Sequence, residues 1–326
     1  MSNVAQAETE NLSTPDAEIK GRSPRQIAWS RFRGNKVGVT AAVFSACIIL
    51  VSTFAPVACR ILGINPNTLN LDQLDPSSIP IGSWGGAGWE HPLGLIPGTG
   101  RDLLAQLLYG SRISFMVAAI VTFLSVAIGL LVGVTGGYFG GKVDYWLMRF
   151  VDFLLAFPSF FMIVALSDPM VQRVKSVGLK NDNNARILVL ILILSFFSWA
   201  YFSRLMRSQV LSLREREFVT AAQALGASRS RIIFKELLPN LWAPVIVVVS
   251  LSLPGYLAVE STFSFLGIGV QPPAFTWGLL LSNSTNYVTA MPTFFFITAM
   301  SLVVVVLAFN LVGDALRDAL DPRSER

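Results

Sequence analysis

The stretch Ser261–Gly313 reads STFSFLGIGVQPPAFTWGLLLSNSTNYVTAMPTFFFITAMSLVVVVLAFNLVG and contains no charged residue. A helix needs about 20 apolar residues to cross the hydrocarbon core of a bilayer, so this stretch is long enough for two crossings. Gly267, Gly269, Pro272 and Pro273 interrupt its first half, and lipid-exposed backbone does not tolerate such interruptions. We therefore expect a loop or re-entrant segment protected by protein over 261–290 and a span over Met291–Gly313, with seven spans in total as the alternative.

The composition excludes an ordinary water-soluble protein. Of the 326 residues, 53% are hydrophobic and only 14% are charged, against about 25% charged in a typical soluble domain. The net charge of +5 comes from Lys and Arg residues that are scattered between uncharged runs, which favours loops beside a membrane over a nucleic-acid surface. Cys47 and Cys59 are about 18 Å apart on one helix, too far for a disulfide, and a lone His91 argues against a metal site.

Further apolar runs predict five spans ahead of the one over Met291–Gly313, which makes an all-α polytopic membrane protein with six transmembrane helices. Glycines that follow Val134 predict that the second helix ends there, and the third run is short enough that its helix is expected to begin near Val143. The predicted first span is 37–59, and the other four runs are Ile113–Val134, Val143–Ser167, Ile187–Ser203 and Leu237–Val259.

The distribution of basic residues predicts the orientation. If the amino terminus is inside, 18 of the 25 Lys and Arg residues lie on the inner side and 7 on the outer side, as the positive-inside rule favours. Both termini are then cytoplasmic in a multi-pass protein of the inner membrane. The expected units are a cytoplasmic tail over 1–36, an external loop over 60–112, a core over 113–313 and a cytoplasmic end over 314–326.

The segment Pro24–Lys36 within the tail combines aromatic and basic side chains. Trp29 and Phe32 alternate with Arg31 and Arg33, which is typical of a helix that lies on an anionic membrane surface. A solvated basic flank without membrane contact is the alternative.

The inner segment 204–240, RLMRSQVLSLREREFVTAAQALGASRSRIIFKELLPN, is water-exposed by position and yet amphipathic. Val219, Ala222 and Leu225 are spaced as one face of a short helix, and Gly226 ends it. A second apolar face follows, and Pro239 is expected to end that element. We interpret this helix, glycine and helix as a surface that fits a groove on a cytoplasmic partner; packing on the protein's own bundle is the alternative.

This segment resembles the EAA loop of ATP-binding-cassette (ABC) importer permeases. The alanine pair Ala221-Ala222, then Gly226 and the terminal Leu238-Pro239, carry the resemblance, while Thr220 occupies a position where the family often has glutamate. The resemblance implies the type I ABC importer fold and a coupling helix that docks on an ATPase subunit. The coupling residues that it implies are Thr220, Ala221, Ala222, Leu225, Gly226, Ala227 and Pro239.

Other stretches are similar to the dipeptide and oligopeptide branch of that family, in its second, C-type permease subunit. They are His91–Gly94, Gly100–Asp102, Tyr109–Arg112, Gly137–Gly141, Leu155–Pro158, Ser264–Pro273 and Trp277-Gly278. The resemblance implies import of di- or oligopeptides and a heterodimer with a homologous second permease subunit. It also implies cytoplasmic ABC ATPase subunits and an external solute-binding protein. ATP and Mg²⁺ would act through the partner subunits, with no cofactor, metal or catalytic residue in this chain.

Several residues are candidates for a gate or pore. Asp144, Arg149 and Asp152 either form a gate network at the inner mouth or include a simple ion pair between Arg149 and Asp152. Glu260, beside the uncharged stretch, is either a proton-coupling group or a helix-end residue bonded to the following loop, which we favour. Phe157 and Pro158 belong to an aromatic stripe that is more typical of helix packing than of a substrate pathway.

Three other functions are disfavoured by the sequence. Gly136–Lys142 has the spacing G-x-x-x-x-G-K, but Val143 stands where a P-loop needs Ser or Thr, and no strand precedes it. A self-sufficient secondary transporter or channel predicts ionisable residues near the middle of several spans and an internal repeat, and we find neither. A membrane-embedded hydrolase needs a nucleophile and a base, which one external histidine does not supply.

Overall fold

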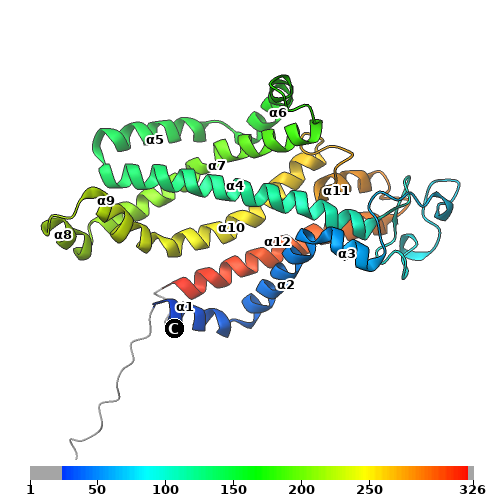
Figure 1. Cartoon of the computed structure of the whole chain (residues 1–326), viewed down its shortest axis with the longest axis horizontal. Coiled ribbons are helices and arrows are strands. Elements are labelled where there is room, and N and C mark those ends of the chain that lie inside the picture. Colours follow the sequence, from blue (N-terminus) through cyan, green and yellow to red (C-terminus); the bar gives the residue numbers. More distant parts are fainter. Residues whose placement is uncertain (1–23, 322–326) are drawn as a thin grey trace, which may run out of the picture.

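The computed structural model describes residues 24–321, so the expected tail residues 1–23 and the end 322–326 lie outside the described residues. The described chain is a bundle of long helices that run side by side (Figure 1). Its elements are α1 (Pro24–Gly34), α2 (Lys36–Thr53), α3 (Ala55–Leu62), η1 (Leu71–Gln73), η2 (Ser83–Gly85), β1 (Leu95–Ile96), β2 (Arg101–Asp102), α4 (Leu103–Phe139), α5 (Gly141–Ala156), α6 (Ser159–Ser176), α7 (Asp182–Arg214), α8 (Glu217–Ala224), α9 (Arg229–Arg231), the π-helical η3 (Ile232–Leu237), α10 (Leu238–Phe265), α11 (Trp277–Thr285) and α12 (Pro292–Leu320).

The described helices include five that are long and apolar enough to span a membrane. They are α2, α4, α7, the continuous helix Arg229–Phe265 and α12. A sixth span results if α5 and α6, which are bent by 81° at a short break, count as one. This is the number of spans that the sequence predicts.

The second span is longer than predicted because the glycines of α4 are packing positions and do not end the helix. The helix continues past Val134 to Phe139 and packs along α7. A Cβ atom at Gly133 would lie 2.6 Å from the Ser203 carbonyl oxygen of α7, and one at Gly137 would lie 2.9 Å from the Val210 Cβ. Glycines at a spacing of four place the two backbones in close contact, as in many membrane helix pairs.

Helices extend into both ends of the segment 60–112 that the sequence predicts to be external. α3 runs to Leu62 and α4 begins at Leu103, so the stretch between these two helices is 63–102. Asp102 starts α4 as its N-cap, where its Oδ1 accepts from the Ala105 amide at 2.7 Å. Its Oδ2 lies 2.9 Å from the His91 Nδ1, so this histidine supports a cap. At the other end of the core, α12 continues beyond Gly313, so 314–320 of the expected cytoplasmic end is helical.

The third predicted span is not one helix. Phe157 has an extended backbone (φ −82°, ψ 132°) between α5 and α6. The cause is Pro158, because the ring of a proline disfavours helical geometry at the residue before it. The break turns α6 away from the direction of α5 (Figure 1).

Pro239 does not end a helix, contrary to the prediction. The chain is helical from Arg229 to Phe265, and Pro239 is near the start of α10. In the π-helical turn before it, the Leu238 amide donates to the Ile233 carbonyl five residues earlier. This wider turn accommodates a residue that has no N–H to donate.

The segment 261–290 contains the end of α10, a loop and the nine-residue helix α11. A helix of nine residues is too short to cross a bilayer, so the seven-span alternative does not describe this fold. The segment is protected by protein as expected: Trp277 is buried, and its Nε1 donates to the Leu107 carbonyl of α4 at 3.0 Å.

The bundle has two distinct ends. α1, α8, α9 and the carboxyl end of α12 lie at one end, and α3, the loop 63–102 and α11 lie at the other (Figure 1). Arg31 of α1 donates to the Asp321 carbonyl at 2.8 Å, which joins the two ends of the described chain.

A test of the α4–α7 contact is the pair of substitutions Gly133→Ala and Gly255→Ala. A Cβ at Gly133 must displace backbone, whereas a Cβ at Gly255 of α10 meets nothing within 4 Å. We expect Gly133→Ala to destabilise by about 1–3 kcal/mol through overpacking. Gly255→Ala is expected to be neutral or slightly stabilising because alanine favours helix by about 0.5–1 kcal/mol. Thermal unfolding in detergent measures both, and equal unfolding temperatures would contradict the assignment.

Candidate functional site

The candidate coupling element is α8 with the turn that follows it. The Ala227 amide donates to the Ala222 carbonyl at 3.0 Å, and the Gly226 amide donates to the Gln223 carbonyl at 2.9 Å. These two bonds form a Schellman motif with Gly226 at the left-handed position, φ +78°. A Cβ at Gly226 would meet no atom within 4 Å, so the backbone conformation, and not space, requires glycine there.

The turn projects an apolar tip into the surroundings. Leu225 is 89% exposed, and Phe218 at the other end of α8 is 40% exposed. The sequence predicted that Val219, Ala222 and Leu225 share one face. In the structure Val219 is buried, Ala222 is half-buried and Leu225 points outward, because α8 ends at Ala224 and Leu225 already belongs to the cap.

One apolar cluster anchors this tip to the bundle. Val219 of α8 and the predicted second apolar face, represented by Ile232 and Leu237, are almost completely buried. They pack in the same cluster as residues of α7, α4 and α10, namely Met206, Val210, Val134, Leu241 and Val245. α8 therefore shares one packed cluster with three long helices.

The remaining predicted coupling residues lie around α8 but differ in their surroundings. Thr220 is exposed, its Oγ1 donates to the Glu217 carbonyl at 3.0 Å, and it lines a groove with Tyr138 and Arg214. Ala221 is exposed on α8, and Pro239 is exposed in the first turn of α10. Pro239 therefore belongs to the following helix and not to the tip.

Behind the tip, two ion pairs join α5 to α7. Arg207 binds Asp144 with its Nε and Nη2, and Arg204 binds Asp152 with its Nη2. The alternative in which Arg149 simply pairs with Asp152 is not observed; Arg149 lies over the Tyr145 ring at 5.6 Å, and Asp152 pairs with Arg204. Helical spacing suggested a pair within α5, but the arginines of α7 face the same carboxylates from across the contact.

These groups surround an open cavity of about 580 Å³ between α5 and α7, lined by Gly141, Asp144, Tyr145, Met148, Arg149, Asp152, Arg204 and Arg207. The structure thus places the three predicted gate residues around one cavity. Sequence reasoning missed Arg204 and Arg207 as their partners. The available signal was two arginines three residues apart at the end of an apolar run, which places them on one helix face.

The other gate candidates lie elsewhere. Glu260 is fully buried in α10, and its Oε1 accepts from the Ser264 Oγ at 2.7 Å. The same Oγ accepts from the Val270 amide at 3.3 Å, so Glu260 is tied through Ser264 to the loop that follows α10. Phe157 and Pro158 form the break between α5 and α6, and the Phe157 ring contacts Phe153 at 4.9 Å between centroids.

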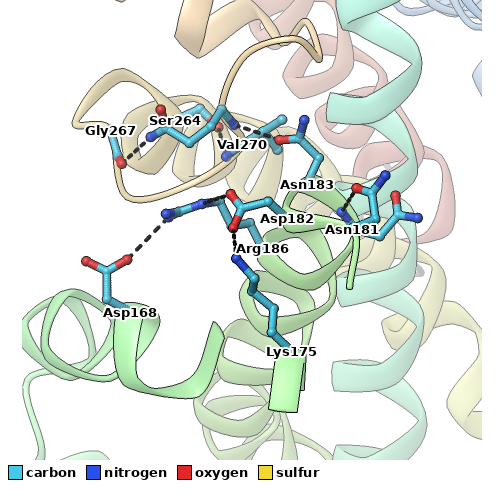
Figure 2. Close-up of polar contacts among 11 residues, drawn as sticks. Asp168, Lys175, Asn181, Asp182, Asn183, Arg186, Ser264, Gly267 and Val270 are labelled. Atoms are coloured by element: carbon cyan, nitrogen blue, oxygen red, sulfur yellow. Dashed lines mark hydrogen bonds and ion pairs between the residues drawn. The ribbon is translucent and has the colours of Figure 1, made fainter. Parts of the chain in front are cut away.

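A second polar cluster joins α6, α7 and the loop after α10 (Figure 2). Of these elements, α6 lies away from the α8 end of the bundle (Figure 1). Asp182 accepts from the Lys175 Nζ at 2.8 Å and from the Arg186 Nε at 2.9 Å. Arg186 also donates to Asp168 at 3.3 Å, and the Asn183 Oδ1 accepts from the Gln271 amide at 3.2 Å. Two of the basic residues between the third and fourth predicted spans are therefore neutralised by carboxylates.

Comparison with known proteins identifies the class of protein to which this architecture belongs. A family model described as "Binding-protein-dependent transport system inner membrane component" matches residues 125–326. The chain therefore belongs to this family, the multi-pass permease subunits of ABC importers. A second model, described as the N-terminal TM domain of oligopeptide transport permease C, matches residues 23–73 and defines the branch.

Curated relatives agree with that branch. The chain is 35% identical over 308 residues to the oligopeptide transport system permease protein OppC of Haemophilus influenzae, covering 94% of this chain and 91% of the relative. It is 40% identical to the OppC of Mycobacterium tuberculosis, covering 93% and 96% of the two chains. It is 33% identical to the dipeptide transport system permease protein DppC of Alkalihalophilus pseudofirmus, covering 96% and 94%.

A solved structure supports the fold independently. An inward-facing conformation of the MetNI methionine ABC transporter matches with a TM-score of 0.52 at 18% identity, covering 66% of this chain and 96% of that chain. At this identity the likeness establishes the type I importer fold alone. It agrees with the fold predicted from the sequence.

A double-mutant cycle tests whether the pair Asp144–Arg207 links α5 to α7. We expect Asp144→Ala and Arg207→Ala to be non-additive, with an interaction energy of about 0.5–3 kcal/mol, because the two side chains contact each other directly. The matched control is Asp168–Arg186, where Asp168 is 79% exposed and the expected interaction is about 0–1 kcal/mol. Thermal unfolding of the detergent-purified protein measures both cycles. Additive effects at Asp144 and Arg207 would contradict the link.

Proposed function

We propose that this chain is the second, C-type permease subunit of a peptide importer, and that α8 is its coupling helix. The observation that carries the proposal is the exposed tip at Phe218 and Leu225 on a helix whose inner face is buried in the cluster shared by α4, α7 and α10. An exposed apolar tip on a rigid anchor is suited to receive force from a partner and to pass it to the bundle.

The proposed partners follow from the family and from the two ends of the bundle. Cytoplasmic ABC ATPase subunits bind α8 and hydrolyse ATP with Mg²⁺, so this chain holds neither group and breaks no bond. A homologous permease subunit completes the translocation path as a heterodimer. An external binding protein delivers the di- or oligopeptide at the opposite end. Both termini are then cytoplasmic, since α1 and the carboxyl end of α12 lie at the same end as α8 (Figure 1).

The mechanism is rigid-body alternating access. Closure of the ATPase subunits moves α8, and the anchoring cluster transmits that movement to α4, α7 and α10. The ion pairs of Arg204 and Arg207 extend it to α5, which borders the cavity of Asp144, Arg149 and Asp152. These residues, with Phe157, Pro158 and Glu260, remain the candidate gate.

Gly226→Trp tests the coupling role. Tryptophan adds bulk at the tip and strains a left-handed backbone by about 1–2 kcal/mol. We expect peptide uptake to fall at least about tenfold, because a loss of about 1.4 kcal/mol at a docked interface already reduces affinity tenfold. Membrane insertion should persist, since the tip is outside the bundle. The matched control is Gly63→Trp, a left-handed cap glycine at the opposite end with φ +70° and no atom within 4 Å of a Cβ. Normal uptake by Gly226→Trp would refute the assignment.

Co-purification tests the partners. A tag on the carboxyl terminus and mild detergent extraction from native membranes should recover a second permease, ABC ATPase subunits and a binding protein, and mass spectrometry of the bound ligand should show a peptide. A homo-oligomer that transports after reconstitution alone would instead favour the secondary transporter.

A further inference from the structure

A small pocket is lined by residues of the loop that leads into α4, of α11 and of the loop after α10. These elements lie at the end of the bundle opposite α8 (Figure 1). The volume of the pocket is about 230 Å³. Thr99, Arg101 and Phe275 line it, together with Asn283 of α11 and Tyr287 in the turn that follows α11. Pro272, Pro273 and Asn283 are exposed, so the pocket opens at the molecular surface.

The pocket presents unsatisfied hydrogen-bond donors around one positive charge. Arg101 is the sole charged residue among its lining residues, and the guanidinium lies 5.9 Å from the centre of the Phe275 ring. The Arg101 Nε and the Thr99 Oγ1 are buried and have no hydrogen-bond partner within the described chain. Nor does Arg101 form an ion pair with any described carboxylate, in contrast to Arg186 at the same end.

These features define the chemistry of a group that would fit the pocket. A buried donor without a partner costs free energy, and a guanidinium with free N–H groups matches a carboxylate in both charge and planar geometry. Small-molecule pockets usually enclose about 300–1,000 Å³. At about 230 Å³ this pocket fits one acidic side chain better than a whole peptide.

We propose that the Arg101 pocket receives an aspartate or glutamate side chain of the external binding protein. This inference rests on the proposed function, because it requires that a binding protein docks at this end of the bundle. The carboxylate accepts from Arg101 and Thr99, and the ring of Phe275 shields the pair from water. Desolvation of a charge pair on docking makes it a determinant of the dissociation rate.

The test measures binding of the purified binding protein to the complete importer in nanodiscs. We expect Arg101→Gln to weaken binding by about tenfold to a hundredfold, mainly through faster dissociation. The matched control is Arg112→Gln, since Arg112 also lies 5.9 Å from an aromatic ring but does not line the pocket. Its effect should stay within about twofold.

A second variant covers the case in which Arg101→Gln fails to assemble. Asn283→Trp fills the mouth of the pocket from α11 and leaves Arg101 in place; it should weaken docking as well. Arg101→Glu should recover binding when one exposed acidic residue of the binding protein is replaced by arginine, which a purely structural role would not produce.

The outcomes separate this inference from the function on which it rests. If the wild-type importer binds the protein and both Arg101→Gln and Asn283→Trp bind equally well, the inference is wrong and the proposed function stands. Unchanged docking with a raised KM for peptide would assign the pocket to the substrate and also overturn it. If the wild-type importer binds no such protein, the proposed function itself fails.

Discussion

The close contact between α4 and α7 is the constraint on which the rest of the structure depends. In a bilayer, helices gain little from burying apolar side chains against each other, since lipid is equally apolar, and association relies on close packing. Gly129, Gly133 and Gly137 remove the side chains that would keep the helices apart. A Cβ atom added at any of these three positions would lie less than 3.0 Å from a backbone or Cβ atom of α7, which is too close for a larger residue.

This contact also suits α7 to the transmission of movement that we propose. The helix is continuous from Asp182 to Arg214, and α8 begins three residues after it ends. At the start of α7, Asp182 and Arg186 bind side chains of α6. Asn183 accepts a hydrogen bond from the loop after α10. Near its end, Arg214 donates to the Gly137 carbonyl of α4 at 3.1 Å. A helix that is fixed to its neighbours at both ends moves with them as one body.

The sequence was sufficient for the number of spans and the family, because these depend on long apolar runs and on local motifs. It was insufficient where a residue has two opposite uses. Gly133 and Gly137 end helices in water but allow contact between helices in a membrane, so α4 was predicted too short. Pro158 breaks the helix between α5 and α6, whereas Pro239 lies within a continuous helix because a π-helical turn precedes it. The outcome depends on the backbone around each proline.

The same limit applies to charges, whose meaning depends on partners far away in the sequence. Asp152 pairs with Arg204, 52 residues away, and not with Arg149 three residues away, because α5 presents its carboxylates to α7. Lys175 and Arg186 count as two positive charges in the sequence, yet Asp182 and Asp168 neutralise them in the fold. Within the described chain, Arg101 has no such partner. A positive charge that the fold leaves unpaired in a pocket, while it pairs others at the same end, is best explained by an acidic group supplied from outside the chain.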